Sequence, residues 1–288
     1  MPELPEVEVV RRGLDVHARG RTIKDVTVFD ERVVVGAPQR WREAIVGCRI
    51  TTVARRGKFL WLGMGEQAAV IHLGMSGQVL VGTPRRPPRH CRVRLAMSDG
   101  GVLDYVDQRM FGRLSVSPYE ATLDGKPGGV GELEARVPHL VAHIGRDYLD
   151  PHLARQEWKR ALAASRRPIK AVLLDQHLAS GLGNIYADET LFFARVHPLT
   201  LARELSTRTL NRILACARDV MSSALAAGGT SFDSLYVDVD GHPGYFQRSL
   251  ACYGREGEPC VRCASPIRRI VIQGRSTHLC ARCQRRPR

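Results

Sequence analysis

The 288-residue chain lacks any apolar run that approaches the roughly 18 residues needed to span a bilayer. It also lacks a secretory signal at its N-terminus, because charged side chains interrupt the first residues at Glu3, Glu6, Glu8, Arg11 and Arg12. Neither a lipid anchor nor a basic amphipathic helix with an aromatic face is found. These absences argue against a membrane partner and predict a cytoplasmic protein.

Acidic residues are missing from the end of the chain, where none follows Glu258. The formal net charge is +14, and the excess cations are nearly all arginine. A guanidinium is planar and suits phosphates and base edges better than an ammonium does. We therefore favour a nucleic-acid partner over a basic face that is merely solvated. The arginines gather in two stretches, at Arg85, Arg86, Arg89, Arg92 and Arg94, and at Arg262, Arg268, Arg269, Arg275, Arg282, Arg285, Arg286 and Arg288.

No internal repeat is present, and the first part of the chain changes from a helical to a strand pattern. Residues 1–20 place Val7, Val10 and Leu14 at helical spacing on one face. Residues from about 21 to 118 are rich in β-branched side chains and punctuated by glycines. The sequence therefore predicts an N-terminal helix followed by a β-rich domain.

From about residue 150 the pattern becomes helical again. A long helix is expected from a Ser206 cap to the glycines at 228 and 229. Residues 228–248 are rich in glycine and aromatics and are expected to form a mobile loop. The second half therefore reads as a helical domain with a small appended module.

The eight cysteines fall into two sets. Four are scattered and are expected to be buried thiols. The other four have the spacing C-x2-C-x16-C-x2-C, which is typical of a tetrathiolate zinc site, and two disulfides would suit a cytoplasmic protein poorly. Four thiolates leave no open coordination position, so this zinc would be structural. The predicted ligands are Cys260, Cys263, Cys280 and Cys283.

The stretch SGLGNIYADETLFFA predicts a tight turn followed by a helix. Gly181 and Gly183 allow the turn, and Asn184 is expected to cap a helix that starts at Ile185. Free N–H groups at a helix N-terminus bind phosphate, so two interpretations stand side by side. The segment is either a phosphate site or a simple connection between helices.

The chain begins MPELPEVE, which places a proline directly behind the initiator methionine. If Met1 is removed, Pro2 carries a free secondary amine that is less basic than a lysine. Such an amine can attack a sugar carbon and form an iminium ion. The alternative is that the segment only opens a helix, where Pro5 is tolerated because its missing N–H is not needed.

Several motifs occur together in one order along the chain: MPELPEVE, RRGKFL, HLGMSG, DQRMFGR, SGLGNIYADE, GGTSFDSLYVDVDG, YGREGEPC and the terminal cysteine module. Together they resemble the bacterial formamidopyrimidine-DNA glycosylases nearly from end to end. The resemblance implies an α+β fold of two domains. Residues 1–130 would form a catalytic β-sandwich carrying the N-terminal helix. Residues 131–249 would form a helix–two-turn–helix DNA-binding domain with a lesion loop, and residues 250–288 a four-cysteine zinc finger.

The resemblance also implies an activity, a bifunctional glycosylase and AP lyase of base excision repair. As a monomer with one structural zinc ion, it would flip oxidised purines such as 8-oxoguanine and formamidopyrimidines out of damaged duplex DNA and remove them. Pro2 would attack the deoxyribose C1′, Glu3 would protonate the ring oxygen, and Glu6 would support them. Lys58 would act in β-elimination and Arg275 in δ-elimination. The expected location is the bacterial cytoplasm, in association with the nucleoid.

Six further residues are implied to contact DNA. An apolar wedge, an aromatic ring and a guanidinium suit the space left by the flipped base and its orphaned partner. The three residues matching that set are Met75, Phe111 and Arg109. The others are His90, Asn184 and Arg166, the last at a position where the residue type varies. Without the resemblance, Met75 and Phe111 would be read as core residues and Lys58 as an exposed strand lysine.

Two positions depart from the family pattern. Met110 stands in DQRMFGR where a second polar or basic residue is expected, so contacts to the partner base are predicted to differ in detail. Cys91 follows His90 and is either an inert thiol or an oxidation-sensitive one.

Three other functions remain as alternatives. An endonuclease VIII-like glycosylase for oxidised pyrimidines would share Pro2, Glu3, Lys58 and the zinc finger, but it usually has glycine where this chain has Leu4. A non-catalytic lesion-binding protein would follow if Met1 were retained. A zinc-ribbon RNA-binding protein fits the charge but leaves the N-terminal motif without a role.

Overall fold

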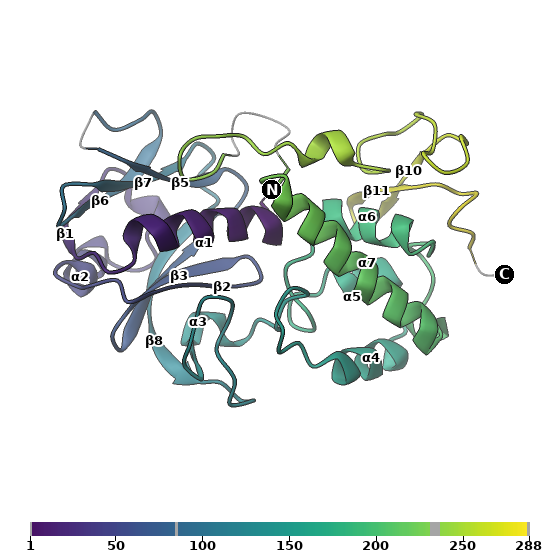
Figure 1. The fold of residues 1–288 in the computed structure, drawn as a ribbon, viewed down its shortest axis with the longest axis horizontal. Coiled ribbons are helices and arrows are strands. Elements are labelled where there is room, and N and C mark those ends of the chain that lie inside the picture. The colour runs from purple at the N-terminus through teal and green to yellow at the C-terminus, as the bar shows by residue number, and fades with distance from the viewer. Residues whose placement is uncertain (1, 84–85, 231–236, 287–288) are drawn as a thin grey trace. The chain divides into compact units, whose positions relative to one another are not determined.

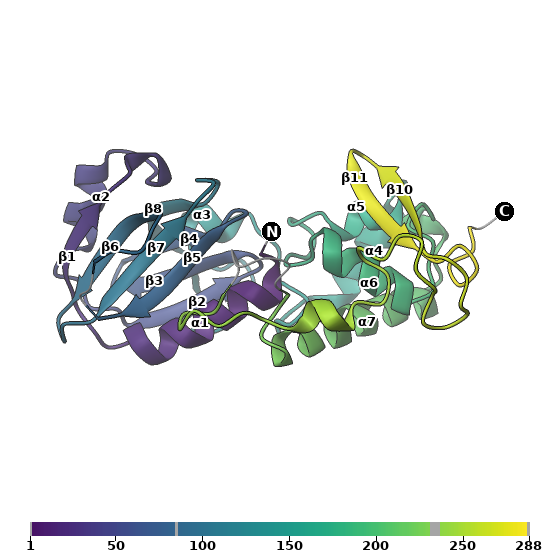
Figure 2. The same cartoon turned by 90° about the horizontal axis from the view of Figure 1, so that it is seen from above.

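A computed structural model describes residues 2–83, 86–230 and 237–286, which fold into two compact units (Figures 1 and 2). Unit 1 is Met1–His143 with Ala227–Tyr245, and unit 2 is Ile144–Ala226 with Phe246–Arg288. Met1, Arg85 and residues 231–236 of the expected mobile loop lie outside the described residues. Among the described residues, no helix is both long and apolar enough to cross a membrane.

Unit 1 is built on two antiparallel sheets, and this confirms the predicted sandwich. Buried apolar residues alternate with half-buried residues along positions 91–97 of the four-stranded sheet, so that one face of this strand lies in the core. The four-stranded sheet has the order β1 (Ile23–Val28), β6 (Cys91–Met97), β7 (Val102–Asp107) and β5 (Gly77–Gly82). The five-stranded sheet has the order β2 (Thr52–Arg56), β3 (Phe59–Met64), β4 (Gln67–His72), β8 (Arg113–Ala121) and β9 (Arg136–Pro138).

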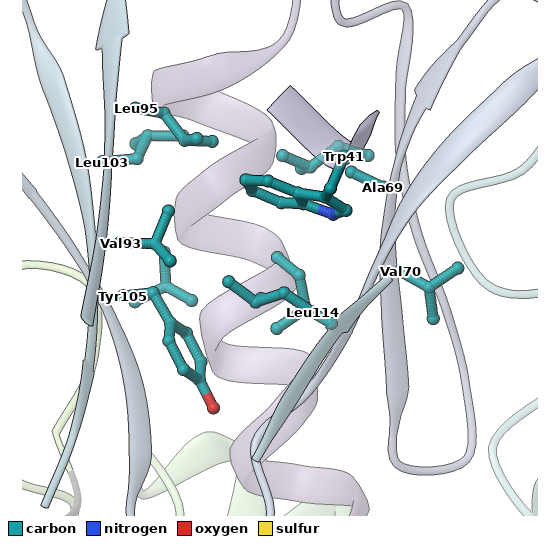
Figure 3. Close-up of a pocket in the computed structure, with 11 residues that line it drawn as sticks. Trp41, Ala69, Val70, Val93, Leu95, Leu103, Tyr105 and Leu114 are labelled. Atoms are coloured by element: carbon teal, nitrogen blue, oxygen red, sulfur yellow. The ribbon is translucent and has the colours of Figure 1, made fainter. Parts of the chain in front are cut away.

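The core of unit 1 lies between these sheets. Figure 3 shows this apolar interior, where Val93 and Tyr105 of one sheet face Leu114 of the other beneath the ring of Trp41. Helix α1 (Leu4–Ala18) adds Val7, Val10 and Leu14 to the same core, as their spacing predicted. The remaining short helical elements of this unit are η1 (Glu31–Val33), α2 (Pro38–Ile45), which carries Trp41, and α3 (His139–Ala142).

Residues 237–245 belong to unit 1, although the sequence-based ranges grouped them with the helical domain. Val239 is buried in the sandwich core, and its carbonyl accepts the backbone N–H of Val81 at 2.9 Å. Gly13 provides the space, because a Cβ there would lie 2.3 Å from a methyl carbon of Val239. The segment after the long helix is therefore held beside α1.

Unit 2 combines helices with a two-stranded hairpin. The predicted helix from Ser206 is confirmed as α7 (Thr207–Ala226), and the Ser206 hydroxyl accepts the N–H of Thr209 as an N-cap. Its helical elements are α4 (Arg155–Ala164), α5 (Ile169–Leu173), α6 (Asn184–Phe193), η2 (Ala202–Glu204), α7 (Thr207–Ala226) and η3 (Phe246–Ser249). The hairpin is β10 (Arg268–Ile272) paired with β11 (Arg275–Leu279), and the four cysteines flank it.

Candidate functional site

The N-terminal turn of α1 is buried and closed by two carboxylates. Glu3 is the N-cap residue, and its side chain accepts the backbone N–H of Glu6. In return, Glu6 accepts the backbone N–H of Glu3 at 2.7 Å, which completes a capping box. Pro2 is buried directly before this turn, and Glu3 and Glu6 are each 1% exposed. Pro5 stands in the first helical turn, as expected.

Glu6 also reaches a distant part of unit 1. Its second carboxylate oxygen accepts the backbone N–H of Thr230 at 2.8 Å. Gly229, at φ +87°, approaches the Glu6 carboxylate so closely that a Cβ would lie 3.1 to 3.5 Å from its atoms. Gly229 and Thr230 are therefore fixed to the helical turn that follows Pro2.

Lys58 lies in the tight turn that joins β2 to β3. Gly57 adopts φ +57°, a left-handed conformation that favours glycine, and Lys58 follows it half-buried. The ring of the neighbouring His72 packs against Phe59 at a tilt of 51°, with ring centroids 4.8 Å apart. Burial, together with the charges of Lys58 and Arg113, lowers the pKa of His72 below its usual value. His72 is therefore neutral at neutral pH and adds no charge beside Lys58.

A buried ion pair connects α1 to this turn. Arg55 is almost wholly buried, and its Nε donates to the Glu8 carboxylate at 3.0 Å. Its Nη1 donates to the carbonyl of Gly57 at 3.1 Å. Burial would raise the pKa of Glu8, but the charge of Arg55 and the hydrogen bonds and charge of Arg11 outweigh it and lower that pKa to about 2. Glu8 therefore stays ionised at neutral pH.

Met75, Arg109 and Phe111 lie in two loops that meet at one buried carboxylate, Asp107. Asp107 is 0% exposed and accepts hydrogen bonds from the Ser76 hydroxyl at 2.6 Å and from the N–H of Arg109 at 3.2 Å. Its other oxygen accepts the N–H of Gly112 at 2.9 Å. The three side chains themselves are exposed, Met75 by 43% and Phe111 by 56%. They are therefore presented to solvent and do not belong to the core.

His90 joins this cluster through its backbone. It adopts φ +63°, and its carbonyl accepts the N–H of Asp107 at 3.0 Å. Burial, aided by the neighbouring Asp104 carboxylate, raises the pKa of the Cys91 thiol to about 12. Cys91 is therefore an inert buried thiol. Met110, at φ +56°, packs half-buried against the sandwich core, so it anchors the loop from inside.

In unit 2, Asn184 and Arg275 are brought together by the hairpin. Asn184 is the first residue of α6, and Gly183 is its N-cap, so the expected capping role of Asn184 is wrong. The Asn184 amide donates to the carbonyl of Ser276 at 2.8 Å, because β11 passes beside the helix N-terminus. Arg275 is exposed at the hairpin turn, which Gln273 (φ +48°) and Gly274 (φ +74°) form.

A buried cation fixes the same strand. Lys170 is 1% exposed and donates to the Ser276 carbonyl at 3.1 Å and to the Thr277 hydroxyl at 2.8 Å. Arg166 lies apart from this network, exposed in the connection between α4 and α5. Neither Lys170 nor Asp107 stood out in the sequence, because a lone Lys or Asp between apolar residues does not reveal whether it is buried.

The four predicted zinc ligands converge at the ends of the hairpin. Their sulfur atoms all lie within 4.8 Å of one another, and Cys263 and Cys280 are 3.5 Å apart. Cys260 and Cys283 are 4.0 Å apart. A tetrahedral site with Zn–S bonds of ~2.3 Å has sulfurs ~3.8 Å apart, so the cluster fits zinc. A bound zinc ion would be held by these four thiolates and would fix both ends of the hairpin.

Three family models match most of the chain. They describe the formamidopyrimidine-DNA glycosylase N-terminal domain over residues 1–114, its H2TH domain over residues 144–235, and a zinc finger found in FPG and IleRS over residues 257–286. The chain belongs to the formamidopyrimidine-DNA glycosylase family. The matched zinc finger spans all four cysteines, so the structural zinc site belongs to the family fold.

Related proteins and solved structures support this assignment over nearly the full length of the chain. The formamidopyrimidine-DNA glycosylase of Corynebacterium jeikeium is 49% identical over 99% of this chain and 100% of its own length. A crystal structure of the MutM (Fpg) protein from Thermus thermophilus superposes with a TM-score of 0.82 at 38% identity, covering 98% of both chains. The Lactococcus lactis Fpg bound to abasic-site DNA superposes with a TM-score of 0.83 at 28% identity, covering 99% of this chain and all of its own.

Proposed function

We propose that this chain is a bifunctional DNA glycosylase and AP lyase that excises oxidised purines from duplex DNA in base excision repair. Family membership supports the activity, and the structure of the N-terminal turn carries the proposal. Pro2 stands directly before a buried capping box that two carboxylates, Glu3 and Glu6, complete.

The first chemical steps are assigned to this turn. Once Met1 is removed, the Pro2 nitrogen attacks C1′ of the flipped nucleotide, and the bond from C1′ to the base breaks. The bonding pair leaves with the base, which takes up a proton. Glu3 protonates the ring oxygen as the bond from C1′ to that oxygen breaks, and the Pro2 nitrogen loses its proton to give the iminium. Glu6 holds the N-terminal turn of α1 and Thr230 in place through its two hydrogen bonds.

The second steps cut the DNA strand. The iminium makes the C2′ hydrogens acidic, and Lys58 takes part in the proton transfer while the bond from C3′ to its phosphate oxygen breaks. A second elimination breaks the bond from C5′ to the other phosphate, and Arg275 is assigned to assist this departure. Both phosphates leave as anions. The product is a one-nucleotide gap with a phosphate at each end.

Residues of both units are assigned to contact DNA. In unit 1, Met75, Arg109 and Phe111 would fill the space left by the flipped base and read its partner, with His90 on the backbone nearby. In unit 2, Asn184, Arg166 and Arg275 would contact phosphates, the first at the N-terminus of α6. The exposure of Met75 and Phe111 supports this role, because Asp107 fixes the loops that present these two apolar side chains to solvent.

Oxidised purines are favoured over oxidised pyrimidines. The chain has Leu4 within PELPE, and Leu4 is fully buried at the start of α1. The glycine usual in the endonuclease VIII-like enzymes would leave that space empty. We also propose that the enzyme acts as a monomer on chromosomal DNA, with the nucleoid of a bacterial cytoplasm as its place of action.

The test is a cleavage assay on two matched duplexes. One carries 8-oxoguanine opposite cytosine, and the other carries an oxidised pyrimidine at the same position. We expect faster cleavage of the first and products with phosphate at both new ends. Preferential cleavage of the pyrimidine duplex would favour the sister activity. Binding of either lesion without cleavage, by protein with a free Pro2, would favour the lesion-binding alternative.

A further inference from the structure

We propose that Arg55 is a positioning residue that fixes Lys58 relative to the Pro2 turn. The inference rests on the proposed function, since it concerns how two assigned groups are aligned. All residues involved belong to unit 1. The observation behind it is that one side chain bonds to α1 and to the β2–β3 turn at the same time.

The contacts of Arg55 form a continuous chain between the two groups. At one end, its Nε bonds to Glu8 in α1, the helix whose first turn follows Pro2. At the other end, its Nη1 bonds to the carbonyl of Gly57, the residue before Lys58. A guanidinium holds its donors in a rigid fork, so the two contacts fix an angle as well as a distance.

The Glu8 carboxylate and the backbone of Arg55 are themselves held by further hydrogen bonds. The Glu8 carboxylate also accepts two hydrogen bonds from Arg11 and one from Arg12, each at 3.0 Å. The backbone of Arg55 exchanges two 2.9 Å hydrogen bonds with Val130. The contacts of Arg55 therefore leave little freedom of movement, and the position of Lys58 is fixed relative to α1.

Stability alone does not explain this arrangement. A buried ion pair contributes little net stability compared with apolar residues of similar size, because both charges lose their hydration. The best-supported role of a buried ion pair is to fix how secondary-structure elements align with one another. Here the elements are the helix that begins beside the nucleophile and the turn that carries the lysine. A displacement of about 1 Å between reacting groups can cost about a hundredfold in rate.

The test is a double-mutant cycle of Arg55→Lys with Lys58→Met in the full-length protein. Lysine keeps the charge at position 55 but has no fork, so it cannot hold Glu8 and Gly57 together. Single-turnover cleavage of the 8-oxoguanine duplex is measured below the melting temperature of each variant. We expect Arg55→Lys to lower the rate by about tenfold or more, and to lower it no further in the Lys58→Met background. Equal losses in both backgrounds would overturn the proposal, because Arg55 would then act without Lys58.

The matched control is Arg146→Lys in unit 2. Arg146 is also buried and pairs with Asp150 at 2.8 Å, but it lies in neither α1 nor the β2–β3 turn. It should leave the cleavage rate within about twofold in both backgrounds. If Arg55→Lys does not fold, Glu8→Gln takes its place in the cycle with the same expected epistasis. Inactive wild-type protein with a free Pro2 would instead refute the proposed function.

Discussion

Lys170 and Asp188 form an ion pair of 2.7 Å in which the two side chains are 1% and 0% exposed. Asp188 lies in α6 and also accepts the backbone N–H of His278 at 2.8 Å, so the pair joins α6 to β11. Strand β11, which begins at Arg275, is therefore fixed by buried charge on the helical side, and a zinc ion held by the four cysteines would fix the hairpin ends.

Lys170→Met is expected to destabilise the protein strongly. It leaves the Asp188 carboxylate buried without its cation and removes two hydrogen bonds to β11. We expect a loss of about 3–5 kcal/mol in the free energy of unfolding. The control is Arg167→Met, which breaks a pair with Asp175 that is 52% and 27% exposed and should cost at most about 1 kcal/mol. Urea unfolding of both variants measures the difference, and similar losses would contradict the buried-network account.

Asp107→Ala is expected to weaken recognition of the base opposite the lesion. The change removes the acceptor that holds the Ser76, Arg109 and Gly112 loops together. Arg109 and Phe111 should then lose their fixed orientation. The measurement is the ratio of cleavage rates with cytosine and with adenine opposite 8-oxoguanine, and we expect it to fall by about tenfold, or ~1.4 kcal/mol.

Asp104→Ala is the matched control for Asp107→Ala. Asp104 is also a buried carboxylate of β7, but it accepts its hydrogen bonds from Arg94 and Cys91 of the neighbouring strand β6. It should lower stability without changing the ratio of rates. An unchanged ratio in Asp107→Ala would show that the loops do not depend on this carboxylate.

Low pH should reduce the stabilisation that the ionised Glu8 carboxylate gives to the folded protein. Its folded-state pKa of about 2 lies below its ordinary value of 4.5, so its stabilisation is fully present above that value and is lost as pH falls through the folded pKa. The destabilisation caused by Glu8→Gln should therefore be larger at pH about 6 than at pH about 3.5. Urea unfolding at both pH values measures it, and an equal loss at both would contradict the lowered pKa.

Zinc removal is expected to abolish DNA binding by unit 2. The four thiolates fit one ion, and without it both ends of the hairpin that presents Arg275 are released. Chelation, or Cys260→Ser, should weaken binding to an abasic-site duplex and reduce its dependence on salt, because fewer phosphates are neutralised. Cys216→Ser, outside the zinc cluster, is the control. A salt dependence unchanged after verified zinc loss would contradict this role.

Much of the architecture was predictable from the sequence, because it depends on local patterns. The helical spacing of Val7, Val10 and Leu14 and the spacing of the four cysteines predict elements that the structure contains. The prediction that Asn184 caps α6 was wrong, because its side chain donates to the carbonyl of Ser276 in the hairpin instead. The roles of Asp107 and Arg55 could not be predicted, because Ser76 and Glu8, which they contact, lie far away in the sequence, and the local pattern does not show that either residue is buried.

The central claim is that Pro2 is the nucleophile, and borohydride trapping tests it most directly. Protein with a verified free Pro2 is mixed with a duplex containing one 8-oxoguanine opposite cytosine, reduced, and analysed by intact mass and peptide mapping. The account predicts one covalent DNA adduct on the Pro2 nitrogen and none on protein that retains Met1. An adduct on a lysine, or none with free Pro2, would contradict it.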